Sequence, residues 1–197
     1  MNRFTFMKLG RMMLMAAVFA VVLSSCGDDN GANSGGGGAN ATVTIGGVKW
    51  MKKNLNVKTE GSWCYDGKDA NCDKYGRLYT YSAADAACSS IGMFLPGDKE
   101  LDALVTAAGG AGVAGKKLKS KSGWDNNNNG TDNYGFSALP GGYRDNGYFK
   151  GVGKTGYWWK DKGAYSATKG WILEGDGLGG EAGFSAGDGL SVRCWKY

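Results

Sequence analysis

Histidine is absent from this sequence of 197 residues, and proline occurs only twice. Without histidine, the chain cannot form a Ser-His-Asp or Cys-His nucleophile, a histidine general base, or a zinc or iron site with histidine ligands. None of the five cysteines stands in a Cys-x-x-Cys pair, which argues against a cysteine metal cluster. These absences favour a binding protein over most kinds of enzyme.

Glycine and aromatic residues are, in contrast, abundant. The chain has 36 glycines, and aromatic residues make up 12% of it. The glycines follow no G-X-Y repeat, so the chain is not collagen-like, and 42% of hydrophobic residues is enough for a folded core. Dense glycine beside dense aromatic residues predicts many turns that link short strands. The length indicates one domain with appendages.

The first residues have the pattern of an export signal. Three basic residues precede an apolar run over residues 12–23, which is shorter than the ~20 residues that a membrane span needs. The sequence LSSC at residues 23–26 then resembles the lipobox of bacterial lipoproteins, in which the cysteine is acylated. We predict a lipoprotein signal peptide over residues 1–25 and a lipid anchor, such as palmitate, on Cys26. The alternative is an ordinary secretory signal beside a chance cysteine.

Residues 26–41 are predicted to form a flexible tether rich in glycine and asparagine. Asp28 and Asp29 lie close behind Cys26, which resembles the surface-export signal of Bacteroidetes-type lipoproteins; a solvated linker is the alternative. We therefore expect an exported lipoprotein of the outer membrane, with the cell surface as a candidate location. Loss of residues 1–25 would remove three positive charges and no negative one. The formal net charge would fall from +5 to +2, which argues against a nucleic-acid partner.

Four cysteines remain for the folded domain, residues 42–197. An even number in an exported domain indicates two disulfides, for which three connectivities exist. Cys64 and Cys72 flank a turn-rich segment and are expected to pair. Cys88 would then pair with Cys194 and would join an early helix to the last strand.

The fold class that the sequence predicts is α+β, with two short helices and several short antiparallel strands. Gly46-Gly47 between two β-like segments is a hairpin signal. The predicted strands lie at residues 43–45, 48–50, 77–81, 136–143, 157–159, 171–173 and 190–195. One helix is expected to begin at Ser82 and to end near Cys88. The other would begin at Gly97 or Asp98 with Glu100 in a capping box, and its buried face would comprise Leu101, Leu104, Val105 and Ala108.

Residues 125–132 resemble the first half of a calcium-binding loop, because oxygen-bearing side chains occupy alternate positions before a glycine. The candidate calcium ligands are Asp125, Asn127, Asn129 and Asp132. The closing glutamate is missing, since Phe136 stands at the twelfth position, so distant oxygen atoms would have to complete the site. The alternative is a loop rich in Asx turns that holds no ion. No other cofactor is expected.

Aromatic residues in the second half provide a candidate ligand-binding surface, since their rings can stack on sugars or bury at protein interfaces. The candidate residues are Tyr143, Arg144, Asp145, Tyr157, Trp158 and Trp159. Consecutive residues of a strand point to opposite faces, so one of Trp158 and Trp159 belongs to the core and the other is a candidate for exposure. The alternative is that all these rings are core.

A short basic run comprises Lys116, Lys117, Lys119 and Lys121. It could contact anionic polysaccharide or lipid headgroups. The alternative is a solvated edge that discourages strand pairing.

An ordered series of motifs carries a family resemblance. The motifs are GVKWMKKNLNV (47–57), WCY (63–65), NCDKYGRLY (71–79), LP (95–96), GTDNYGFSALPGGYR (130–144), GYWW (156–159) and SVRC (191–194). Together they resemble the Fibrobacter succinogenes major paralogous domain over residues 43–197. Members of that family are typically exported bacterial lipoproteins, and the resemblance implies no established activity. It further implies a fold related to C-type lectins and to formylglycine-generating enzymes.

We expect a non-catalytic binding module that a lipid anchor holds at a membrane, with polysaccharide or an envelope protein as its partner. One alternative is an enzyme on a formylglycine-generating type of scaffold, and another is a structural adhesin. The redox-active cysteine pair of the formylglycine-generating relatives does not carry over, because only Cys194 lies near the end of this chain. The carboxylates of Asp98, Glu100 and Asp102 lie at a helix start, where they are expected to serve capping rather than catalysis.

Overall fold

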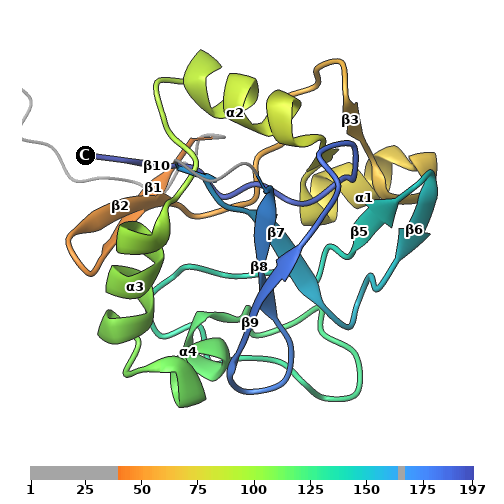
Figure 1. Ribbon diagram of the computed structural model, residues 1–197. Helices are drawn as coiled ribbons and strands as arrows, with labels where there is room; N and C mark the ends of the chain where they lie inside the picture. Colours follow the sequence, from red (N-terminus) through yellow and green to blue (C-terminus); the bar gives the residue numbers. More distant parts are fainter. Residues whose placement is uncertain (1–39, 164–166) are drawn as a thin grey trace, which may run out of the picture. The chain divides into compact units, whose positions relative to one another are not determined.

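The computed structural model describes residues 40–163 and 167–197 (Figure 1). The predicted signal peptide, the predicted lipid-anchor residue Cys26 and most of the predicted tether lie outside the described residues. Residues 36–197 form one compact unit. Both hydrophobic clusters and both disulfides described below lie inside this unit, so we expect it to fold on its own. Within the described ranges, no helix is long and apolar enough to cross a membrane.

The unit begins with the predicted hairpin. Strands β1 (Thr42–Ile45) and β2 (Val48–Met51) pair antiparallel around Gly46 and Gly47. Both glycines have positive φ (61° and 80°), which side chains of L-residues disfavour. The short strand β10 (Trp195–Lys196) pairs with the other edge of β2. The two ends of the unit therefore share one sheet (Figure 1).

Three further small sheets are all antiparallel. They pair β3 (Ser62–Trp63) with β4 (Leu78–Tyr79), β5 (Tyr143–Asp145) with β6 (Tyr148–Lys150), and β8 (Lys169–Leu173) with both β7 (Gly156–Trp159) and β9 (Leu178–Gly183). The sequence patterns did not predict β3, β6 and β9. The predicted strand at residues 190–195 meets a strand of the structure only at Trp195, where β10 begins. The predicted strand at residues 136–143 is wrong over most of its length, because β5 begins only at Tyr143.

Four α-helices are present in the part of the chain that the structure describes. They are α1 (Asp69–Tyr75), α2 (Tyr81–Ser90), α3 (Asp98–Ala107) and α4 (Ala111–Leu118), and the 3-10 turn η1 (Tyr65–Gly67) precedes α1. The sequence predicted α2 and α3 but not α1 and α4. Thr80 rather than Ser82 caps α2, since its hydroxyl accepts a hydrogen bond from the Ala83 N–H. The cap of α3 is as predicted: the Gly97 N–H donates to the Glu100 carboxylate over 2.9 Å.

Strand β7 lies between two hydrophobic clusters. Trp158 belongs to the first cluster, where its ring stacks on Trp171 with the ring centres 4.4 Å apart. Trp159 belongs to the second cluster, together with Tyr79 and Cys88. Because side chains alternate along a strand, these two neighbours serve the two different clusters.

Both predicted disulfides are confirmed. Cys64–Cys72 closes a loop with a sequence separation of 8, and Cys88–Cys194 spans a separation of 106. The long link ties α2 to the segment that leads into β10. The α+β class is confirmed as well, whereas the C-type-lectin-like assignment stays a prediction.

Candidate ligand-binding surface

The structure removes Trp158 and Trp159 from the predicted binding surface. Both side chains are fully buried. Their indole N–H groups are used inside the fold: Trp158 donates to Asn54 Oδ1 over 2.8 Å, and Trp159 donates to the Tyr79 carbonyl over 2.6 Å. The prediction that one of the two rings is exposed is therefore wrong, because clusters cover both faces of β7.

Tyr143 and Tyr157, two of the candidate ligand-binding residues, lie together in the structure. Their ring centres are 4.7 Å apart, and Phe184 lies 5.9 Å from each. All three residues are half-buried. Burial raises the pKa of the Tyr157 hydroxyl, so this hydroxyl stays protonated and can donate a hydrogen bond. The three rings form the margin of the second cluster.

Arg144 stacks on an aromatic ring that the sequence analysis did not select. Its guanidinium carbon lies 4.0 Å from the centre of the Trp63 ring. A pair of backbone hydrogen bonds between Arg144 and Gly189, both 2.8 Å, fixes the position of the arginine. A Cβ atom on Gly189 would come within 3.0 Å of Arg144 Cβ and 3.3 Å of Trp63 Cε3. Glycine is thus needed here because the stacked pair occupies the space of a side chain.

Two hollows meet at this arginine, and we name their joint lining the Arg144 surface. One hollow of about 550 Å³ is lined by Arg144, Asp145, Asn146, Gly147, Ser185, Gly187 and Asp188. The other, of about 370 Å³, is lined by Lys58, Ser62, Trp63, Cys64, Gly67, Asp69, Arg77, Arg144, Gly147 and Phe149. Three basic and three acidic side chains therefore share the surface. It combines balanced charge with hydroxyl and amide groups and one half-buried indole ring.

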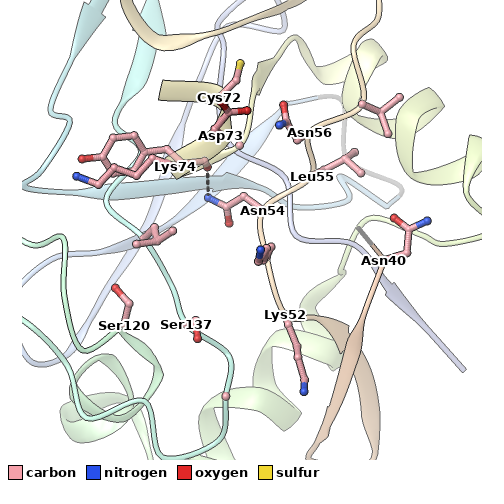
Figure 2. A pocket seen from close by; sticks show the side chains of 16 residues that line it. Asn40, Lys52, Asn54, Leu55, Asn56, Cys72, Asp73, Lys74, Ser120 and Ser137 are labelled. Carbon is pink, nitrogen blue, oxygen red and sulfur yellow. Dashed lines mark hydrogen bonds between the residues drawn. The ribbon is translucent and has the colours of Figure 1, made fainter. Parts of the chain in front are cut away.

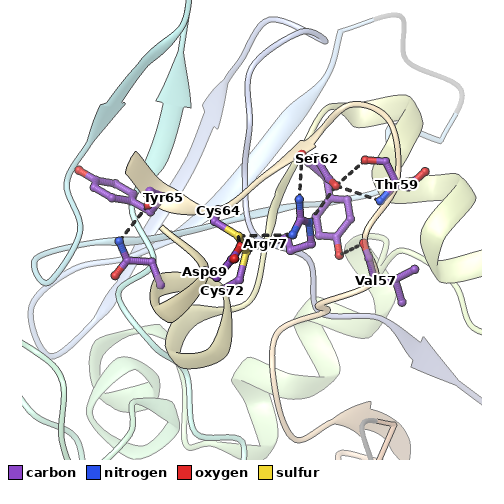
Figure 3. Close-up of a disulfide and its surroundings, with 10 residues drawn as sticks. Val57, Thr59, Ser62, Cys64, Tyr65, Asp69, Cys72 and Arg77 are labelled. Carbon is purple, nitrogen blue, oxygen red and sulfur yellow. Dashed lines mark hydrogen bonds between the residues drawn. A yellow bond between two sulfur atoms is a disulfide. The ribbon is translucent and has the colours of Figure 1, made fainter. Parts of the chain in front are cut away.

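Cys64, one of the residues that line the Arg144 surface, forms a disulfide with Cys72, and Figure 3 shows Arg77 beside this disulfide. Arg77 Nη1 lies 3.4 Å from the sulfur atoms of both cysteines. The same guanidinium donates to the hydroxyl and the carbonyl of Ser62, which precedes Trp63 in β3. Arg77 thereby links the disulfide to the strand that presents the indole ring.

Several side-chain oxygen atoms of the predicted calcium loop accept hydrogen bonds from the protein itself. Asn129 Oδ1 accepts from the Trp124 N–H over 3.0 Å, and the Asp132 carboxylate accepts from the N–H and the hydroxyl of Ser137. Asp125 and Asn127 remain exposed. Among the described residues, no group of three His, Cys, Asp or Glu side chains could hold a metal ion. These contacts favour the alternative, a loop ordered by Asx hydrogen bonds that holds no ion, over the calcium site.

The lysines of the basic run differ in their burial. Lys119 is buried: its ammonium donates to the Gly175 carbonyl and to Asn128 Oδ1 and lies 4.6 Å from the centre of the Trp124 ring. Burial lowers the pKa of this lysine. Lys121 is exposed. Lys119 therefore ties two segments together rather than serving as a solvated edge or as a contact for anions.

Sequence reasoning missed a larger groove of about 770 Å³ (Figure 2). It lies between the segment after β2, the end of α1 and residues 120–139, and we name it the lysine groove. Its lining includes Lys52, Lys53, Asn54, Leu55, Asn56, Val57, Asp73, Lys74, Tyr75, Ser120, Ser137 and Leu139. The Asn54 side chain donates to the Tyr75 carbonyl over 2.7 Å (Figure 2). The adjacent Lys52-Lys53-Asn54 was the available signal, but nothing local indicates that α1 packs opposite it.

The comparisons with known proteins agree with the motif series. The model of the Fibrobacter succinogenes major domain matches residues 43–196. No curated protein and no solved structure shows significant similarity to the chain. The family predicted from the motifs is thus confirmed.

Proposed function

The chain belongs to the Fibrobacter succinogenes major domain family, and we propose that it is a lipid-anchored lipoprotein of the outer membrane or cell surface that binds polysaccharide without catalysis. The anchor follows from the lipobox-like residues 23–26 and the tether after them. The binding role follows from the Arg144 surface. The proposed ligand there is an uncharged polysaccharide.

One observation carries the choice of ligand: the Arg144 guanidinium lies over the Trp63 ring, 4.0 Å from its centre, between two hollows lined by polar side chains. A planar guanidinium offers several N–H donors in a fixed geometry. Asp145 pairs with Lys150 over 2.7 Å and Asp188 accepts from the Ser185 N–H over 2.8 Å, and each carboxylate keeps a second oxygen that can accept from a sugar hydroxyl. The part of the half-buried indole ring that Arg144 leaves uncovered adds apolar surface beside these polar groups. Because acidic and basic side chains balance, the surface does not require a charged ligand.

A glycan array probed with residues 36–197 tests this proposal. We expect binding to uncharged glycans, and Arg144→Ala should weaken it about tenfold, since a hydrogen bond from a charged donor contributes about 1.5–3 kcal/mol. Tyr148→Ala is the matched control, because Tyr148 is 73% exposed on the same hairpin but lines neither hollow. An array without signal, or an Arg144→Ala variant that binds like the unmodified domain, would refute the proposal.

An envelope protein is the second candidate ligand. The specific observation is Tyr148 itself, a large ring exposed at the start of β6, since tyrosine is enriched in protein interfaces. In this case Tyr148→Ala would abolish capture of the partner, and Arg144→Ala would not. The pair of variants thus distinguishes the two ligands.

The anchor has its own test. In the full chain expressed in a bacterium that processes lipoproteins, we expect acylation at Cys26 and recovery with the outer membrane. Cys26→Ser should yield a chain without acyl groups that no longer fractionates with the membrane. A mature chain without acyl groups would contradict the anchor and would leave the binding proposal to be judged by the array alone.

A further inference from the structure

The lysine groove differs from the Arg144 surface in its charge. Lys52, Lys53 and Lys74 are exposed at the groove, and Asp73 is the acidic side chain of its lining. The lining of the groove thus holds three basic side chains and one acidic side chain, whereas acidic and basic side chains are equal in number in the lining of the Arg144 surface. A concave surface with an excess of one sign concentrates ligands of the opposite sign.

A buried cation lies behind the groove. Arg193 is fully buried, and among the described residues its hydrogen bonds go to uncharged acceptors: Asn54 Oδ1 and the carbonyls of Met51, Phe136 and Ser137. Asn54 and Ser137 also line the groove. Burial lowers the pKa of Arg193 and the charge of Asp132 partly opposes that, but a guanidinium keeps its proton at neutral pH. Arg193 therefore adds positive charge beneath the floor, which Asp132 offsets in part.

The remaining lining suits a sugar. Asn56 supplies an exposed amide, the hydroxyl oxygens of Ser120 and Ser137 can accept further hydrogen bonds, and Val57 and Leu139 supply partly exposed apolar walls. The volume of about 770 Å³ lies in the range of about 300–1,000 Å³ that is usual for small-ligand sites. A simple phosphate would use only the lysines and would leave the amide and apolar walls without partners.

We propose that the lysine groove is a second binding site, which takes a carboxylate-bearing oligosaccharide. The lysines pair with the carboxylates, the amide and hydroxyls bind the sugar hydroxyls, and the apolar walls pack on the C–H faces of the rings. This site shares no lining residue with the Arg144 surface. It does not depend on the proposed binding of uncharged polysaccharide.

Titration calorimetry of residues 36–197 with tri-galacturonate tests the proposal, with the methyl ester of the same trisaccharide as the uncharged match. We expect the acid to bind, the ester to bind at least about tenfold more weakly, and the affinity for the acid to fall at high salt. Lys53→Glu combined with Lys74→Glu should weaken binding of the acid by about tenfold or more. The control combines Lys99→Glu with Lys154→Glu, which changes the net charge equally at exposed lysines outside the groove.

Each result decides. Equal affinities for acid and ester, no binding of either, or equal losses in the two double variants would overturn the proposal. Binding of anionic phospholipid vesicles by the domain with no response to tri-galacturonate would make the groove a headgroup site and would also overturn it. Arg144→Ala should leave binding of tri-galacturonate unchanged, so this proposal and the proposed function fail separately. All exchanged lysines are exposed, and equal melting temperatures would confirm that the variants fold.

Discussion

Replacing Cys88 and Cys194 by alanine is expected to destabilise the domain about twice as much as replacing Cys64 and Cys72. The reason is the length of chain that each disulfide closes. The sequence separations are 106 for the Cys88–Cys194 link and 8 for the Cys64–Cys72 link. A disulfide restricts the unfolded chain, and the restriction grows with the logarithm of the loop length.

The magnitude follows from these separations. Loop-closure entropy gives about 4.8 kcal/mol for the long loop and about 2.5 kcal/mol for the short one at 25 °C. Local packing acts in the same direction, because Cys88 and Cys194 are fully buried and belong to the second cluster, whereas the other pair is slightly exposed. The expected difference between the two double variants is therefore at least about 2 kcal/mol.

Urea unfolding of residues 36–197, followed by tryptophan fluorescence, measures this difference. All seven tryptophans lie in this unit, so the signal reports the whole fold. The free energy of unfolding is obtained for the unmodified domain and for both double variants under the same conditions. The reasoning would be refuted if the two variants lost equal stability, or if loss of the short link cost more. The latter result would assign the larger effect to the contacts of Arg77 with the sulfur atoms of Cys64 and Cys72.

Three further predictions follow from other contacts. Arg193→Met should lower the free energy of unfolding by about 2–4 kcal/mol, because the buried carbonyls of Met51 and Phe136 lose their donor. The variant no longer buries a charge, which offsets part of the loss. Urea unfolding that shows a loss below about 0.5 kcal/mol would contradict this. Lys160 is buried and pairs with Asp98 and Glu181; burial opposes its charge, but these partners raise its pKa, and its hydrogen bond lowers the pKa of Asp98. Lys160→Met should therefore lower stability most at neutral pH. The loss should become smaller as pH falls through the folded pKa of Asp98, which lies below its unfolded value of ~4, and as pH rises through the folded pKa of Lys160, which lies above its unfolded value of ~10.4. A difference in melting temperature that is independent of pH would contradict this. Finally, adding Ca²⁺ should leave the melting temperature unchanged, because Asn129 and Asp132 already accept hydrogen bonds from the protein, whereas an increase that a chelator reverses would establish the calcium site.

The elements that the sequence predicted are those with strong local signals. Gly46-Gly47 between β-branched residues predicts the hairpin, and the structure has it in the expected register, with Ile45 opposite Val48. Helix α3 was predictable from local sequence as well, because its apolar residues have helical spacing and the Glu100 carboxylate accepts a hydrogen bond from the Gly97 N–H at its start. The disulfides were predictable because one pair is close in sequence, which leaves a single partner for Cys88.

The elements that were missed depend on distant contacts. Helix α4 contains Gly112 and Gly115, and β9 contains three glycines, so neither has a favourable intrinsic propensity. They support each other: the Lys116 N–H donates to the Asp176 carbonyl over 2.8 Å, and a Cβ atom on Gly115 would lie only 2.3 Å from the Gly177 carbonyl oxygen. Glycine is unfavourable for a helix in isolation but is required for this close approach. The gain appears only when both segments are in place.

The sequence predicted individual residues of the candidate site but not their partners from distant parts of the chain. Arg144 was selected as a polar contact in an expected loop after Tyr143, but it lies in β5, and its partner Trp63 comes from β3. Gly189 pairs with Arg144 through two backbone hydrogen bonds. The alternation of a strand correctly separates Trp158 from Trp159, but it cannot tell that a cluster lies on each side. Whether either tryptophan ring is exposed depends on tertiary packing, which the local sequence does not reveal.

Asn54 holds the floor of the lysine groove in place, whereas the exposed lysines are expected to determine which ligand the groove prefers. Its amide donates to the Tyr75 carbonyl, and its oxygen accepts from both Trp158 and Arg193. One buried side chain thus joins α1, the core strand β7 and the segment before β10, so replacing Asn54 would disturb the fold before it could reveal a role in binding. Lys53 and Lys74 are exposed, and the Lys74 ammonium lies 4.7 Å from the centre of the Tyr75 ring. Because Asn54 and not these lysines holds the floor, changes of charge at Lys53 and Lys74 should change which ligand the groove selects, and loss of the Lys74 contact should cost at most about 0.5–1 kcal/mol of stability.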